Sequence, residues 1–189
     1  MPTIDFTNRK SPKELAKLSK PTNNALKQLF INIDTVTIKD HGVYNDKAMS
    51  DKVLLTISDQ NKIKRFSELL EINEANTGFY CMCAGTYAIE LISGSLIKAT
   101  IGFHHGVSIR YHKWNSDAEL AQSDSLLSFL AELGFAEPLQ KKIEADRRRD
   151  ADRIAEREWF DAAPKCFAKY RQQINIIDEE YFPALINDL

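Results

Sequence analysis

Two cysteines and two histidines stand out because their side chains can bind a metal ion or act as nucleophile and base. Cys81 and Cys83 are separated by one methionine, and His104 and His105 follow as an adjacent pair. Thiolate and imidazole are the usual zinc ligands in proteins, and four of them can close a tetrahedral site. These four residues are therefore the candidate metal ligands, and zinc is the candidate cofactor.

The expected local geometry argues against this zinc site. A strand is predicted over 79–84, and side chains two positions apart on a strand lie on one face at about 7 Å. Two thiolates on one zinc ion lie closer than that. Adjacent histidines in an extended segment point to opposite faces, unless a bulge intervenes. The pattern therefore favours Cys81 and Cys83 as small buried side chains with no cofactor, and zinc is the alternative.

A thiolate beside a histidine could also catalyse a reaction as a nucleophile. Cys81, Cys83 and Cys166 are the available thiols. The chain shows no nucleophile elbow, no glycine-rich phosphate loop and no H-E-x-x-H sequence. A zinc- or thiol-dependent enzyme is therefore the second hypothesis, and a protein without enzymatic activity is favoured.

A third group of polar residues falls on one face of a predicted strand. Ser108, Arg110 and His112 alternate with apolar residues over 107–113, and Lys98 and Thr100 are expected on the neighbouring strand. Arg110 and His112 could bind an anion or the carboxylate of a partner. The ordinary interpretation of such a face is contact with solvent.

A turn and a helix start complete the predicted binding set. Gly106 permits a tight turn after His104 and His105. Trp114 and Asp117 are expected to fix the start of the next helix. The candidate binding residues are listed together here: His104, His105, Arg110, His112, Trp114 and Asp117.

The strands and helices that we expect from the sequence, and that must position these residues, indicate an α+β fold. It has an antiparallel meander, helices packed on one face and a long charged C-terminal helix. Alternating apolar residues predict strands over 35–38, 53–57, 79–84, 87–91, 96–103 and 107–113. Helical spacing and caps predict helices over 61–71 after Asp59, from Ser123 to Gly134, and over 137–163. The expected organisation is an N-terminal helical arm at 1–34, a core domain at 35–136 and a C-terminal helical extension at 137–189.

Composition narrows the function classes. The formal net charge is −2, which does not favour nucleic acid or an anionic membrane as a partner, although residues 1–28 are basic and the tail is acidic. No signal peptide and no long apolar run are visible. The three cysteines are an odd number, which favours reduced thiols. We therefore expect a cytoplasmic protein without a membrane segment.

Three motifs carry a resemblance. They are Cys81-x-Cys83-x-Gly85, then His104-His105-Gly106-x-Ser108-Ile109-Arg110, then Trp114-x-x-Asp117-Ala118-x-Leu120. Together they resemble an uncharacterised family of small bacterial proteins, over roughly residues 53–159. The resemblance implies no enzymatic activity and no catalytic residues. Small bacterial proteins of this kind often resemble immunity proteins, which neutralise a toxin.

The leading hypothesis is therefore a protein-binding module of the immunity type, which blocks a partner toxin or effector by direct binding. The alternatives are the zinc- or thiol-dependent enzyme centred on Cys81, Cys83, His104 and His105, and a structural subunit of a larger assembly.

Overall fold

The computed structural model describes residues 11–162. The chain divides into two compact units, Met1–Lys142 and Ile143–Leu189, which are described separately. Cys166, the acidic tail and the first part of the basic N-terminal segment lie outside the described residues. Leu26 and Ile33, which the predicted organisation assigns to the N-terminal arm, are buried in the core of the first unit.

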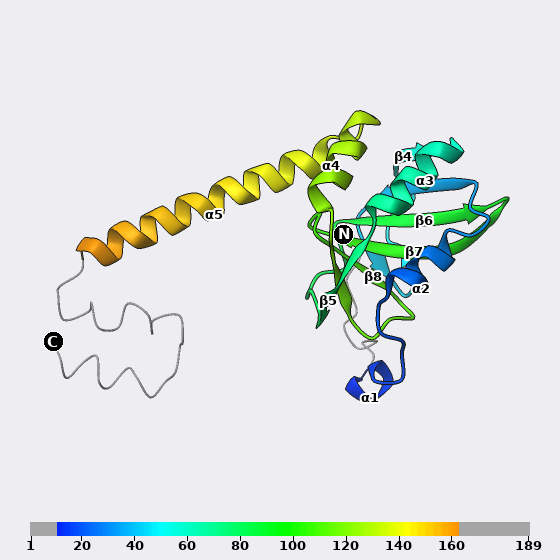
Figure 1. Cartoon of the computed structure of the whole chain (residues 1–189), viewed down its shortest axis with the longest axis horizontal. Helices are drawn as coiled ribbons and strands as arrows, with labels where there is room; N and C mark the ends of the chain where they lie inside the picture. The colour runs from blue at the N-terminus through cyan, green and yellow to red at the C-terminus, as the bar shows by residue number, and fades with distance from the viewer. Residues whose placement is uncertain (1–10, 163–189) are drawn as a thin grey trace. The chain divides into compact units, whose positions relative to one another are not determined.

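The first unit is built on one seven-stranded sheet with the order β4-β1-β6-β7-β8-β9-β5, in which all neighbours are antiparallel (Figure 1). The strands are β1 Thr35–Asp40, β4 Val53–Ile57, β5 Ile72–Phe79, β6 Tyr87–Ser93, β7 Leu96–His104, β8 Ser108–Tyr111 and β9 Asp117–Leu120. Strands β6 to β9 follow one another as hairpins. The predicted α+β class with an antiparallel meander is confirmed.

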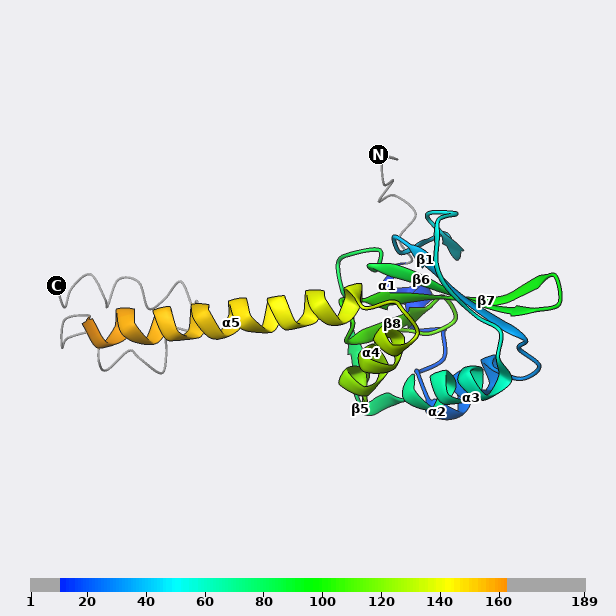
Figure 2. The ribbon, with the colours of Figure 1, turned by 90° about the horizontal axis from the view of Figure 1, so that it is seen from above.

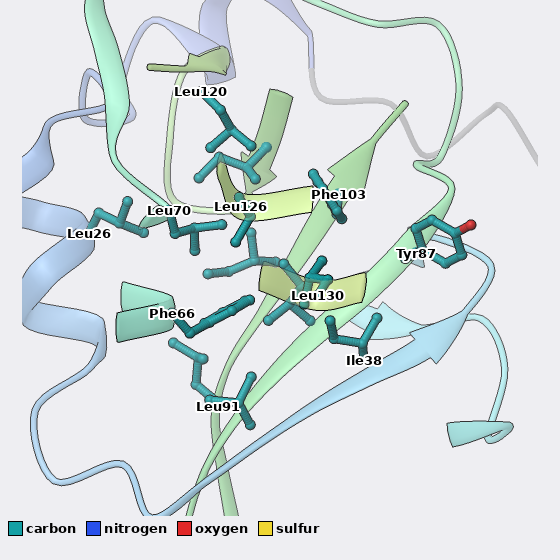
Figure 3. Close-up of a cluster of buried hydrophobic side chains, with 14 of the residues drawn as sticks. Leu26, Ile38, Phe66, Leu70, Tyr87, Leu91, Phe103, Leu120, Leu126 and Leu130 are labelled. Atoms are coloured by element: carbon teal, nitrogen blue, oxygen red, sulfur yellow. The ribbon is translucent and has the colours of Figure 1, made fainter. Parts of the chain in front are cut away.

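Three helices cover one face of this sheet: α2 (Asn23–Leu29), α3 (Gln60–Leu69) and α4 (Ser123–Glu132). Figure 2 shows all three on the same side of the strands. Their buried side chains, including Leu26, Phe66 and Leu130, meet the apolar residues that alternate along the strands, such as Ile38 and Leu91 (Figure 3). The core therefore lies between the helices and this face, as the alternation predicts.

Local signals explain where the helices begin. Asp59 caps α3, because its carboxylate accepts a hydrogen bond from the Lys62 amide at 2.9 Å, as predicted. Thr22 caps α2 in the same way through the Ala25 amide. The predicted cap at Ser123 is wrong, because Gln122 precedes the helix and makes no side-chain cap bond.

The other face of the sheet is polar, but it is not open to solvent. Thr37, Glu90, Thr100, His104 and Ser108 all project from it and are buried. A small ribbon, β2 (Val43–Tyr44) with β3 (Lys47–Ala48), contacts β7 and β6. The expected solvent-exposed sheet face is therefore wrong for Thr100 and Ser108, whereas Lys98 on the same predicted face is exposed.

Two strands differ from the sequence prediction around the cysteines. Strand β5 ends at Phe79, so the predicted strand over 79–84 is wrong and residues 80–86 form an irregular connection. Asp117 and its neighbours form β9, not the start of a helix. Both differences decide the geometry of the candidate site.

The remaining described helices are α1 (Pro12–Leu15) and α5 (Glu137–Ala162). The long charged helix predicted over 137–163 is therefore confirmed. Its surface carries i,i+3 and i,i+4 ion pairs such as Arg148 with Glu144 and Arg153 with Asp150. Ile143, Ile154 and Trp159 are exposed on it. Between residues 11 and 162, no helix has the length and apolar character needed to cross a lipid bilayer.

Candidate metal centre

Cys81 and Cys83 lie in the irregular connection between β5 and β6. Because this connection is not extended, the two cysteine side chains lie close together. Their sulfur atoms are 3.0 Å apart, and both side chains are half-buried. An extended strand would have held them at about 7 Å. The argument from strand geometry against these two residues as joint ligands is therefore wrong.

The two histidines also converge, because their backbone is not extended. His104 is the last residue of β7, and His105 has a φ of 53° in the turn that leads to β8. Gly106, with a φ of 76°, completes this turn, and the Val107 amide donates to the His104 carbonyl at 3.0 Å. The left-handed conformation at His105 removes the alternation of the two side chains, so the expectation that they diverge is wrong.

Both imidazole rings reach the sulfur atoms. His104 Nδ1 lies 3.1 Å from Cys83 Sγ. His105 Nε2 lies 3.4 Å from Cys81 Sγ and 3.3 Å from Cys83 Sγ. Four soft or borderline donor groups from two distant segments therefore meet at one point of the described structure.

A tetrahedral zinc ion, with Zn–S near 2.3 Å and Zn–N near 2.05 Å, has ligand atoms about 3.3–3.8 Å apart. The sulfur–nitrogen contacts of 3.1–3.4 Å lie close to this range, and the two sulfurs, 3.0 Å apart, would separate by less than about 1 Å to hold the ion. The ligand atoms of Cys81, Cys83 and His104 all lie within 4.8 Å of one another. His105 contacts both sulfurs but does not belong to this mutually close set. Cys81, Cys83 and His104 are therefore the three main candidate ligands, and His105 is the candidate fourth.

His104 is in the protonation state that a metal requires. Its side chain is fully buried, and burial, followed by the nearby Arg110 guanidinium, lowers its pKa from 6.5 to about 4. The ring is therefore neutral at pH 7, and neutral imidazole is the metal-binding form. Its Nε2 has no hydrogen-bond partner among the described residues and packs closely over Gly102.

Without a cation, the environment of Cys83 favours the protonated thiol over the thiolate. Burial, and then the adjacent Cys81, raise its pKa, while the Gly85 backbone amide donates to the sulfur and lowers it. Burial disfavours an isolated thiolate, and a divalent ion at this position would replace the proton as the compensating charge. The Gly85 amide is suited to stabilise the sulfur in that bound form.

The ion pair between Arg110 and Asp117 holds the backbone of the cysteine segment through hydrogen bonds. Arg110 on β8 and Asp117 on β9 are joined at 2.5 Å and 2.8 Å, and Asp117 is fully buried. The guanidinium also donates to the carbonyls of Cys81 at 2.6 Å and Cys83 at 3.1 Å. Asp117 in turn accepts from the Cys81 amide at 2.8 Å. Arg110 and Asp117 are therefore positioning residues for the two thiols.

The other predicted binding residues lie nearby in different environments. Trp114 is buried, and its indole ring packs edge-on against Tyr111 at 5.7 Å between ring centres. His112 Nδ1 lies 3.9 Å from an Asp46 carboxylate oxygen. Neither residue contacts the four donor groups in the interactions that the structure shows, so the predicted binding set separates into a metal centre and an adjoining cavity.

This cavity has a volume of about 720 Å³ and lies over the polar face of the sheet. The cysteine segment forms one wall, the β2–β3 ribbon another, and the end of β8 a third. Arg110, His112, Tyr80 and Trp114 are among its lining residues. Sequence reasoning missed the cavity, because the ribbon that encloses it carries no strong periodic signal.

Gly42 joins the ribbon to the cysteine segment, and its substitution gives a test. A Cβ at Gly42 would lie 2.0 Å from the Ala84 carbonyl oxygen, where the Val43 amide also donates at 2.8 Å. We expect Gly42→Ala to lower the free energy of unfolding by about 1–3 kcal/mol and to weaken metal binding, because the cysteine segment must move. Denaturant unfolding and metal titration measure both effects. Gly94→Ala, where a Cβ meets nothing within 4 Å, should leave metal affinity unchanged.

Comparisons with protein-family models, with curated proteins and with solved structures found no match for this chain. The residues of the metal centre are therefore interpreted from their own geometry. The structure brings together six residues of the motifs quoted from the sequence, namely Cys81, Cys83, His104, His105, Arg110 and Asp117.

Proposed function

We propose that this chain is a zinc-binding protein, with Cys81, Cys83 and His104 as ligands and His105 in the fourth position. The observation that carries the proposal is the convergence of two sulfurs and two imidazole nitrogens from distant segments within 3.4 Å contacts. Two thiolates and two neutral imidazoles form one of the common closed donor sets of structural zinc sites.

Such an ion would add a link through side chains to a segment that is otherwise held by hydrogen bonds to its backbone. The cysteine segment has no regular secondary structure, and its bonds to Arg110 and Asp117 fix the backbone but not the sulfurs. A zinc ion would tie these sulfurs to the end of β7 and so fix one wall of the cavity. The proposed role is therefore structural, supporting a binding surface.

Metal analysis tests this proposal directly. The full chain, purified with zinc and without chelator, is expected to contain one zinc ion per chain by elemental mass spectrometry. Cobalt(II) in place of zinc should give the absorption of a tetrahedral ion with thiolate ligands. Cys83→Ser and His104→Gln should each abolish stoichiometric binding. A wild-type chain that binds neither metal would contradict the proposal.

Matched controls exist in the same chain. Cys166→Ser removes the remaining cysteine, and His112→Gln removes a histidine that lines the cavity and whose Nδ1 lies 3.9 Å from an Asp46 carboxylate oxygen. Both variants should retain one zinc ion. Loss of zinc in either control would move the site away from the proposed ligands.

His105 distinguishes a closed site from one with three protein ligands. It is exposed, and it touches both sulfurs without joining the close set of three. We expect His105→Ala to weaken zinc binding about 10–100-fold, well short of the loss caused by His104→Gln, because water can take its place. Competition with a chromogenic chelator measures both affinities. Equal losses in the two variants would make His105 a full ligand.

Zinc affinity should also depend on pH in a defined direction. Zinc must displace the Cys83 proton, whose pKa is raised, so affinity should rise at least tenfold per pH unit through the neutral range. His104 carries no competing proton there, because its pKa is about 4. Chelator competition at several pH values measures the slope. If zinc affinity did not change between roughly pH 6 and 8, this result would argue against thiolate ligands.

We also propose a protein partner for the chain, as the immunity-type hypothesis expects. The supporting observation is that large apolar side chains on α5, Ile154 and Trp159, are 59% and 60% exposed. Aromatic residues are enriched at protein interfaces. A pull-down with the full chain from its native cells should recover one protein in stoichiometric amount, and Trp159→Ala should reduce its recovery. If Trp159→Ala recovered the partner protein equally well, this result would contradict a role for α5 in binding. That the partner is a toxin stays a prediction.

A further inference from the structure

The two sulfur atoms of the metal centre are also placed for chemistry with each other. Cys81 Sγ and Cys83 Sγ are 3.0 Å apart, and a disulfide needs about 2.05 Å. The gap is about 1 Å, and the residues lie in an irregular segment that no strand pairing holds. Side-chain rotation, with a small shift of this irregular segment, would close the gap.

The sulfurs are also open to a reagent from solvent. Both cysteines are half-buried, and the neighbouring His105 and Met82 are exposed. Arg110 holds the carbonyls of both cysteines, so it keeps the pair together when no metal is present. The backbone anchors do not involve the sulfurs, and they can persist while the sulfurs react.

We propose that Cys81 and Cys83 are a reversible oxidation site, at which a low-molecular-weight disulfide converts the two thiolates into an intrachain disulfide and releases zinc. This inference rests on the proposed zinc site. It adds a reagent class and a means of regulation to that site, because one pair of atoms cannot serve as thiolate ligands and as a disulfide at the same time.

The reaction balances with glutathione disulfide as the oxidant. One cysteine thiolate attacks a sulfur of glutathione disulfide, which forms a mixed disulfide and expels one glutathione thiolate. The second cysteine thiolate then attacks the cysteine sulfur of the mixed disulfide and expels the second glutathione thiolate. The two cysteines lose two electrons, the oxidant gains them, and Zn²⁺ is freed because both anionic ligands are lost.

The metal has a protective role in this scheme. Thiolates bound to zinc share their electron pairs with the ion and lie close together without reacting. A disulfide oxidant competes with the metal for those electron pairs, so high zinc should slow the reaction and a chelator should accelerate it. Thioethers do not exchange with disulfides, so the exposed Met82 remains unchanged and does not obscure the result.

The experiment uses the full chain with Cys166→Ser, in which only the two site cysteines remain. The zinc-loaded protein is treated with glutathione disulfide while a chromogenic chelator reports free zinc. Trypsin should release one peptide, residues 66–98, which carries both cysteines. We expect release of one zinc per chain, a peptide that has lost two hydrogens, and recovery of zinc binding after dithiothreitol.

Specific outcomes overturn the inference. A stable mixed disulfide with glutathione, a disulfide between two chains only, or retention of zinc and both thiols under excess oxidant would each contradict it. Cys83→Ser in the same background must stop at a single glutathione adduct. An intrachain disulfide in that variant is impossible, so any loss of two hydrogens there would mark a different reaction.

A parallel arm separates this inference from the zinc proposal. Protein stripped of metal by chelator is oxidised in the same way. A chain that never binds zinc but forms the Cys81–Cys83 disulfide would support the oxidation site and contradict the zinc site. A chain that binds one zinc ion but forms no such disulfide would contradict the oxidation site alone.

Discussion

Removal of zinc from the purified chain is expected to lower its free energy of unfolding by about 4 kcal/mol, when zinc is otherwise held at about a thousand times its dissociation constant. The reason is that zinc binds the folded cluster of Cys81, Cys83 and His104, whereas an unfolded chain does not hold His104 beside the two cysteines. Denaturant unfolding with zinc and with excess chelator measures the difference. The slope against denaturant should change little, because the core between helices and sheet is unaffected.

Two variants decide whether the effect comes from this site. His104→Gln should unfold at the same denaturant concentration with zinc or with chelator, because it lacks a primary ligand. His112→Gln should keep the full difference between the two conditions. A chelator effect that persists in His104→Gln would place the stabilising ion elsewhere in the chain.

Most of the fold could be predicted from the sequence, because its elements carry strong periodic signals. The strand Val53–Ile57 and the capped helix after Asp59 were predicted from apolar spacing and one side chain, and both are confirmed. Strand β5 was missed, because Ile72–Phe79 reads INEANTGF and only its first residue is buried. It is held at the sheet edge by pairing with β9, an interaction that no local pattern reveals.

The residues of the candidate metal centre were singled out from the sequence, but their geometry was predicted wrongly for two physical reasons. Cys81 and Cys83 were assigned a strand that ends before them at Phe79. His104 and His105 were assigned an extended backbone, whereas His105 takes a positive φ. The adjacent Gly106 was a visible signal for a turn, but a glycine does not show which of its neighbours leaves the strand.

The positioning residues could not be predicted, because their roles depend on tertiary contacts. Arg110 was expected to face a ligand or partner from an open sheet face. It instead binds a carboxylate from β9 and two carbonyls from the cysteine segment. The burial of that face by the β2–β3 ribbon and the cysteine segment is the physical reason. A polar strand face in one sequence does not distinguish exposure to solvent from an enclosed hydrogen-bond network.

Asp117→Asn is expected to lower the free energy of unfolding by about 3 kcal/mol, because it leaves the Arg110 guanidinium facing a neutral amide in a largely enclosed position. Asp117 is fully buried and accepts from both Arg110 and the Cys81 amide. The partial exposure of the Arg110 side chain, 29%, places the expected cost at the lower end for a broken buried ion pair.

The same substitution should weaken zinc binding about 10–100-fold, because the Cys81 amide and both cysteine carbonyls lose a fixed partner. Asp124→Asn is the matched control: its carboxylate pairs with Lys142 at 2.9 Å but is 79% exposed, so it should cost less than about 1 kcal/mol. It should also leave zinc affinity unchanged. If Asp117→Asn lost stability but kept full zinc affinity, the ion pair would hold the β8–β9 hairpin without positioning the thiols. If Asp117→Asn lowers both the free energy of unfolding and the zinc affinity, and Asp124→Asn preserves both, the result supports a role of the ion pair in positioning the zinc ligands.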